Sequence, residues 1–152
     1  SNPSTYYAKK ITLKNPTRKG YAFAGWYKDA KFKKKIKTIS SNARCDYTLY
    51  AKWTKVKVGK VSLASAKNSK GKKIVLKSKK VSGAKGYEIS YSTDKKLKKA
   101  VTKKNTTKTS YTISKLKKGK TYYVRIRAYK VDSTGKKVYG KYSSVKKVKI
   151  SK

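Results

Sequence analysis

The sequence contains no histidine, no methionine, a single cysteine and only five acidic residues among 152. The lack of histidine excludes Ser-His-Asp and Cys-His nucleophilic catalysis as well as histidine metal ligation. The lone Cys45 supplies neither a disulfide framework nor a cysteine metal cluster, and we interpret it as an incidental side chain. No run approaches the roughly 18–20 apolar residues that a membrane span needs, so we expect no membrane insertion.

The acidic residues are too scattered in sequence for a paired-carboxylate active site. Each is expected in a loop or at an outward-facing strand position; they are Asp29, Asp46, Glu88, Asp94 and Asp132. A glycosidase needs two carboxylates held about 5–10 Å apart. Glycine-rich phosphate-binding motifs are also absent. We therefore predict that the protein is not an enzyme and that it uses no cofactor and no metal.

What the chain has in excess is lysine and tyrosine. Lys and Arg together number 45, which gives a formal net charge of +40, and there are 14 Tyr. Within 122–129 hydrophobic residues alternate with Arg125 and Arg127, and 87–92 alternates in the same way. A period of two indicates half-buried β-strands. The charge therefore decorates the solvent face of folded sheets, and the residues predicted to be buried are Tyr87, Ile89, Tyr122, Val124 and Ile126.

The composition changes near 54–59, which divides the chain into two unlike blocks. We predict a first module over 1–54, a linker over 55–60 and a second domain over 61–152. In the first block, strands are expected at 23–27 and 47–53, and a short helical turn is expected over 29–36. Gly25 inside the earlier strand predicts a bulge that lets Phe23 and Trp26 both reach the core.

The second block contains turn signals between short strands. The predicted strands are 61–66, 73–78, 87–93, 100–102, 110–113, 122–129 and 138–150. Many short strands without an intervening helix indicate an antiparallel sandwich. The predicted fold class is therefore all-β.

The second block resembles a fibronectin type III domain through 81–89 and through Leu116-Lys117-Lys118-Gly119-Lys120-Thr121-Tyr122, which is similar to the family's L-x-P-G-x-x-Y corner. The resemblance implies an immunoglobulin-like β-sandwich in which the Tyr122 hydroxyl hydrogen-bonds to the main chain a few residues upstream. Lys118 stands where the family usually has proline, and Ser78 stands where a core tryptophan is common. The candidates to fill that space are Tyr87, Tyr91 and Tyr129.

The first block resembles the internalin B-type repeat, also called the Listeria–Bacteroides repeat. The resemblance is carried by G-Y-x-F-x-G-W-Y at 20–27 and T-L-Y-A-x-W at 48–53. It implies a partial β-grasp-like module in which Trp26, Trp53 and Tyr27 pack in the core, a role that we favour over sugar stacking. The first strand of the repeat would precede Ser1, so we expect an unfilled sheet edge and a longer parent protein.

Both resemblances imply a secreted or wall-attached surface protein of a Gram-positive or related bacterium. The predicted function is a stalk or adhesion segment whose lysines bind anionic polymers, such as teichoic acid or polysaccharide, without specificity. The candidate polyanion-binding residues are Lys33, Lys34, Lys35, Lys79, Lys80, Lys98, Lys99, Arg125 and Arg127, with Tyr50, Tyr123 and Tyr129 as stacking faces. The candidate structural residues are Trp26, Trp53, Tyr87 and Tyr122.

Alternatives remain open at this point. The lysines can reflect a compositional bias of the lineage without any binding site. The segment can also be the accessory ligand-binding part of a secreted carbohydrate-active or wall-lytic enzyme, or contact a host surface ligand. Only four of the basic residues are arginine, which disfavours sequence-specific reading of nucleic acid. We expect a monomer in isolation.

Overall fold

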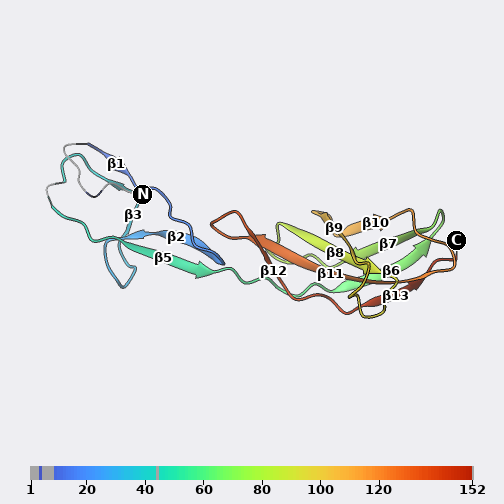
Figure 1. Ribbon diagram of the computed structural model, residues 1–152. Coiled ribbons are helices and arrows are strands. Elements are labelled where there is room, and N and C mark those ends of the chain that lie inside the picture. Colours follow the sequence, from blue (N-terminus) through green and yellow to red (C-terminus); the bar gives the residue numbers. More distant parts are fainter. Residues whose placement is uncertain (1–3, 5–8, 44, 152) are drawn as a thin grey trace. The chain divides into compact units, whose positions relative to one another are not determined.

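The computed structural model describes residues 4, 9–43 and 45–151, and no helix occurs in this part of the chain (Figure 1). The chain divides into two compact units. Unit 1 comprises the residues up to Val56 together with Val131–Lys136, and unit 2 comprises Lys57–Lys130 together with Lys137–Lys152. The fold is all-β, as the sequence predicts.

Unit 1 is built on a three-stranded antiparallel sheet with β2 in its centre, in the order β3-β2-β5. A second, two-stranded pairing joins β1 to β4. The strands are β1 (Ile11–Thr12), β2 (Tyr21–Tyr27), β3 (Lys35–Ile36), β4 (Thr38–Ile39) and β5 (Tyr50–Lys55). Among the described strands only β2 pairs with β5, so the other edge of β5 has no partner among them. The strand predicted over 47–53 is found as β5, which begins later, at Tyr50.

The predicted bulge in β2 is confirmed. The register between β2 and β5 shifts between Phe23 and Gly25, and Gly25 has a φ of 136°. L side chains rarely adopt this φ, so another residue would be strained there and glycine is favoured. The bulge places the Phe23 ring 5.6 Å from Trp26 and 5.4 Å from Trp53, edge to face. Both tryptophans thus contact Phe23 in an aromatic cluster, but they are half-buried, whereas the prediction placed them in the core.

The helical turn predicted over 29–36 is wrong. The Asp29 carboxylate accepts hydrogen bonds from the backbone N–H groups of Lys33 (3.1 Å) and Lys34 (2.7 Å). These bonds hold the segment in a turn that is not helical. Phe32 has a φ of 55°, in the left-handed region that an α-helix cannot continue through. Hydrogen bonds to the Asp29 side chain therefore take the place of the backbone hydrogen bonds of a helix.

The segment Val131–Lys136 completes unit 1 through Asp132. Its carboxylate accepts the N–H of Gly20 at 2.7 Å and the hydroxyl of Thr134 at 2.6 Å. The hydrogen bond from Gly20, followed by that of the Thr134 hydroxyl, lowers the pKa of Asp132 to about 2. This carboxylate is therefore ionised and hydrogen-bonded at neutral pH.

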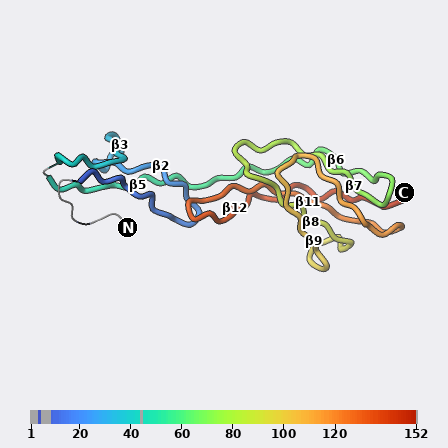
Figure 2. Tube along the Cα trace, turned by 90° about the horizontal axis from the view of Figure 1, so that it is seen from above, coloured from blue at the N-terminus to red at the C-terminus, as the bar shows by residue number. Residues whose placement is uncertain are grey.

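Unit 2 is a sandwich of two antiparallel sheets, one in the order β10-β7-β6 and the other in the order β12-β11-β8-β9, with β13 also paired to β11. The strands are β6 (Leu63–Ser69), β7 (Lys73–Ser78), β8 (Gly86–Ser92), β9 (Thr102–Thr106), β10 (Ser110–Ile113), β11 (Thr121–Val131), β12 (Lys137–Tyr139) and β13 (Lys146–Lys149). Seen from above, β6 and β7 lie on one side and β8 and β9 on the other (Figure 2).

The core between these sheets contains all five residues predicted to be buried, from Tyr87 to Ile126. The predicted tyrosine corner is also confirmed, because the Tyr122 hydroxyl accepts the backbone N–H of Lys117 at 3.2 Å. Of the three tyrosines proposed to fill the tryptophan space, only Tyr87 is buried, and its hydroxyl accepts the N–H of Val81 at 3.0 Å.

Two strands of the second block depart from the prediction. The strand expected at 100–102 begins later, as β9, because Ala100 has a left-handed φ of 48° that a strand cannot include. This edge strand is polar and largely exposed. The strand expected over 138–150 is split into β12 and β13. Between them residues 140–145 belong to no strand. There Ser143 bonds to the main chain of Ile126 with both its N–H (2.8 Å) and its Oγ (3.1 Å), so a side-chain oxygen accepts where a backbone carbonyl would in a continuous ladder.

Candidate polyanion-binding surface

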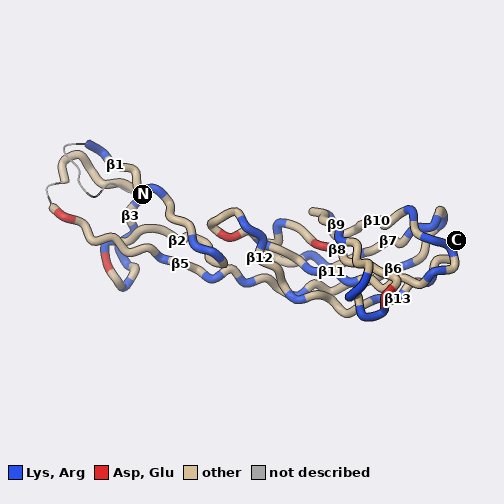
Figure 3. Tube along the Cα trace, viewed as in Figure 1, with Lys and Arg blue, Asp and Glu red and all other residues tan. Residues whose placement is uncertain are grey.

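The predicted lysine clusters lie in exposed turns that belong to different parts of the fold. Lys33–Lys35 follow β2 in unit 1. In unit 2, Lys79–Lys80 lie between β7 and β8, and Lys98–Lys99 lie between β8 and β9. Figure 3 shows basic residues along the strands and turns of both units, with acidic residues at only a few places. The clusters do not converge on one loop, so the arrangement is a distributed surface rather than a pocket.

Two of these turns are each held by hydrogen bonds to an aspartate. Asp94 accepts the backbone N–H groups of Lys98 (2.8 Å) and Lys99 (3.0 Å), as Asp29 does in its own turn. The hydrogen bond from Lys99, followed by that from Lys98, lowers the pKa of the Asp94 carboxyl, and Lys34 and Lys33 do the same for Asp29. The carboxylates bond to the backbone, so the lysine side chains that follow them remain on the surface.

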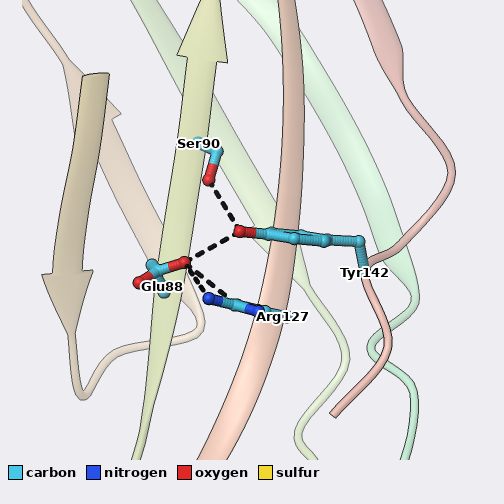
Figure 4. A network of polar contacts seen from close by, with 4 residues as sticks. All are labelled: Glu88, Ser90, Arg127 and Tyr142. Atoms are coloured by element: carbon cyan, nitrogen blue, oxygen red, sulfur yellow. Dashed lines mark hydrogen bonds and ion pairs between the residues drawn. The ribbon is translucent and has the colours of Figure 1, made fainter. Parts of the chain in front are cut away.

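The two arginines of β11 behave differently from the lysines. Arg127 forms an ion pair with Glu88, with its terminal nitrogen 2.8 Å and its Nε 3.0 Å from one carboxylate oxygen. The Tyr142 hydroxyl donates to the same oxygen at 2.8 Å and lies 3.2 Å from Ser90 Oγ (Figure 4). Glu88 is only 6% exposed, because Arg127 and Tyr142 cover the outward-facing strand position at which the sequence placed it.

Tyrosine rings cover both guanidinium groups. Arg125 lies 4.0 Å from the Tyr142 ring, and Arg127 lies 3.8 Å from Tyr139 and 4.5 Å from Tyr142. The Arg125 Nε is buried without a hydrogen-bond partner. Arg127 is therefore a paired and stacked cation that holds the sheet face together, whereas the lysine turns remain open to a ligand.

The Glu88 carboxyl keeps its charge despite being buried. Burial raises its pKa, but the hydrogen bond from Tyr142 and the nearby charge of Arg127 outweigh burial and leave the pKa below 4.5. Arg127 thus faces an ionised partner at neutral pH.

Sequence reasoning missed Tyr139 and Tyr142 as partners of the arginines. In a continuous strand, positions of odd and even number point to opposite faces, so the two rings would be separated. Residues 140–145 lie outside the strands, which removes this restriction, and both rings reach Arg127. The predicted stacking faces also differ from one another, since Tyr50 is exposed whereas Tyr123 and Tyr129 are half-buried.

Neither a metal centre nor a membrane-crossing helix can be assigned to the described residues. They contain no group of three or more Cys, Asp or Glu side chains placed to hold a metal ion. They also contain no helix with the length and apolarity that crossing a bilayer requires.

Comparisons with known proteins identify both blocks. A family model for the Listeria-Bacteroides repeat domain matches residues 1–52, and one for the fibronectin type III domain matches residues 60–141. No curated protein matches the chain. The chain therefore belongs to the fibronectin type III family, with a Listeria-Bacteroides repeat preceding that domain. Domains of these two kinds are generally non-catalytic modules, typical of extracellular or surface proteins.

The chain is also similar to solved structures. An Fn3-like protein from Clostridium thermocellum is 25% identical, with 63% of this chain and 94% of that one covered and a TM-score of 0.46. A structure described as a myokine is 17% identical, with 63% and 100% covered and a TM-score of 0.50. The FN1-FN3 domains of chicken CNTN1 are 14% identical, with a TM-score of 0.54, and the match covers 94% of this chain but only 62% of that one. The second and third of these structures, both below 25% identity, show a likeness of fold alone.

The large positive charge predicts that stability rises with ionic strength. A net charge of +40 repels itself in the compact state, and salt screens this repulsion over a Debye length of about 8–10 Å. We expect the melting temperature to increase by a few degrees between roughly 20 mM and 500 mM NaCl. Differential scanning calorimetry at the two salt concentrations measures this, and an unchanged or lower melting temperature at high salt would contradict it.

Proposed function

We propose that this segment is a non-catalytic stalk or adhesion module of a secreted or wall-attached bacterial surface protein, and that it binds anionic polymers by diffuse electrostatic attraction. Teichoic acid and acidic polysaccharide are the partners whose chemistry fits best, because both present repeated negative charges along a chain. Binding of this kind needs a high density of accessible cations and no shaped pocket.

The observation that carries the proposal is the distribution of the lysines. The turns at Lys33–Lys35, Lys79–Lys80 and Lys98–Lys99 are exposed, and the carboxylates nearest to two of them accept hydrogen bonds from the backbone. Lysine is a mobile point charge that does not impose the fixed geometry of a guanidinium fork. A flexible polymer can therefore neutralise several lysines at once in many arrangements.

The test is the salt dependence of binding to purified wall teichoic acid, heparin and double-stranded DNA. We expect all three to bind at low salt, with log K falling linearly against log salt by about 0.7–0.9 per neutralised charge. Single changes such as Lys34→Ala or Lys99→Ala should each reduce the slope by about one unit or less.

Two results would contradict the proposal. The absence of binding even at low salt would leave a spacer whose lysines have no ligand. Loss of all binding after a single lysine substitution would indicate one defined pocket in place of a diffuse surface.

A further inference from the structure

One face of the sheet in unit 1 exposes aromatic rings beside a lysine. Tyr27 and Tyr50 are directly opposite each other in the pairing of β2 with β5, so their side chains share a face. The Phe32 ring packs edge to face on Tyr27, with centroids 5.4 Å apart. The Lys52 ammonium lies 5.5 Å from the Tyr27 ring and 5.3 Å from the Phe32 ring. We call Tyr27, Phe32, Tyr50 and Lys52 the aromatic–lysine face.

Packing within unit 1 covers the Phe32 side chain only in part. Phe32 and Tyr50 are 36% and 37% exposed, among the large hydrophobic residues that the fold leaves open to solvent. Phe32 also has a left-handed φ of 55°, a conformation that bulky side chains avoid and that glycine or asparagine adopts more readily. The turn therefore retains an unfavourable residue whose ring is not buried.

The corresponding turn in unit 2 provides an internal comparison. Leu97 follows Asp94 by three positions, as Phe32 follows Asp29, and its backbone has nearly the same φ, 51°. In both turns the third residue donates its N–H to the aspartate carbonyl. Leu97 is only 5% exposed, so burial of its side chain offsets the strained backbone. Phe32 lacks this compensation, which points to a role outside the folding of its own unit.

Exposed lysines next to the aromatic–lysine face favour an anionic ligand. Lys33 and Lys34 follow Phe32 directly and are exposed. The Asp29 carboxylate is engaged by the backbone N–H groups of both residues. Exposed aromatic rings next to several ammonium groups fit a ligand ring that carries an anionic substituent, because the rings make contact while the charge is neutralised.

We propose that the aromatic–lysine face binds the sugar rings of an acidic polysaccharide, with a pyranose ring stacked on Phe32 and Tyr50 and its carboxylate near Lys52. This inference rests on the proposed function and refines it, since the distributed lysines attract the polymer and this face selects one whose anionic groups are attached to rings. The face therefore adds a preference among polyanions that charge alone does not provide.

The experiment compares Phe32→Gly with the unmodified chain. Glycine removes the ring and adopts the left-handed conformation without strain, so the turn is retained and the melting temperature should not fall. Phe32→Tyr keeps a stacking ring and serves as the conservative variant. Val145→Ala, in unit 2, removes an exposed apolar side chain that lies outside the proposed face.

Three probes at one fixed salt concentration separate the contributions. Polygalacturonate has acidic sugar rings, inorganic polyphosphate has charge without rings, and single-stranded oligodeoxynucleotide has stacking bases. We expect Phe32→Gly to weaken polygalacturonate binding about 5–30-fold, as loss of one stacked ring does elsewhere. Polyphosphate binding should change less than about twofold, since screening and counterion release are unaltered. Phe32→Tyr should bind like the unmodified chain, and so should Val145→Ala.

The outcomes distinguish the two proposals. Equal effects of Phe32→Gly on polygalacturonate and polyphosphate, or no effect on either, would overturn the sugar-stacking face while leaving diffuse binding intact. A loss confined to the oligodeoxynucleotide would overturn it in favour of a nucleic-acid platform. If the unmodified chain bound none of the probes at low salt, the proposed function itself would fail.

Discussion

Val124→Ala is expected to lower the free energy of unfolding of unit 2 by about 2–3 kcal/mol. Val124 is 0% exposed in the middle of β11, opposite Tyr91 of β8 and Lys146 of β13. The substitution removes two methyl groups, worth about 0.8 kcal/mol each on burial, and leaves a cavity that the two sheets fill only in part. Urea unfolding followed by tyrosine fluorescence and far-UV circular dichroism measures the change, since both tryptophans lie in unit 1 and do not report on unit 2.

Val145→Ala is the matched control because it makes the same chemical change at a residue that is 44% exposed. Its effect should stay within about 0.5 kcal/mol. Ile126→Ala, at a second buried position of β11, should cost about 2–5 kcal/mol. Equal effects at Val124 and Val145 would show that β11 does not carry the core of the sandwich.

Glu88→Ala is expected to cost about 2–4 kcal/mol, because it leaves the Arg127 guanidinium without its anionic partner. The Arg127 side chain is 22% exposed, so water compensates for part of the loss and the effect should fall short of that for a fully enclosed pair. Removal of Glu88 also leaves the Tyr142 hydroxyl without its carboxylate acceptor. The free energy of unfolding at neutral pH measures this effect.

The double variant Glu88→Ala/Arg127→Ala isolates the pair. It should be clearly less destabilised than the sum of the two single variants, because removing both charges leaves neither one unpaired. Additive losses would mean that the two side chains stabilise the sheet independently of each other, through packing on Tyr139 and Tyr142.

The same pair also predicts a pH dependence. The pKa of Glu88 is lower in the folded chain than its ordinary value of 4.5, so its contribution is fully present above about pH 4.5 and is lost as the pH falls below that value. Glu88→Gln removes this carboxyl and should flatten that part of the stability profile. An unchanged acid limb in Glu88→Gln would show that other carboxylates account for it.

Much of unit 2 was predictable because its signals are local. The alternation along β11 assigns each residue to the core or to solvent, since successive side chains of a strand point to opposite faces. The corner motif that ends in Tyr122 predicted a specific hydrogen bond, because the hydroxyl reaches a backbone group only five residues away. Predictions of this kind held wherever the partner was near in sequence or the period was regular.

The sequence alone determined the all-β class, the identity of both modules, the bulge at Gly25 and the buried face of β11. Only the tertiary structure decided which charges are free. Nothing in the local pattern around Glu88 indicates that it meets Arg127, 39 residues away, under the ring of Tyr142. Nor does local sequence distinguish Phe32 from Leu97, which occupy equivalent turns yet differ in burial. Periodicity specifies the face on which a side chain lies, whereas its neighbours there depend on strand order and on bulges, which are set by contacts between residues far apart in the chain.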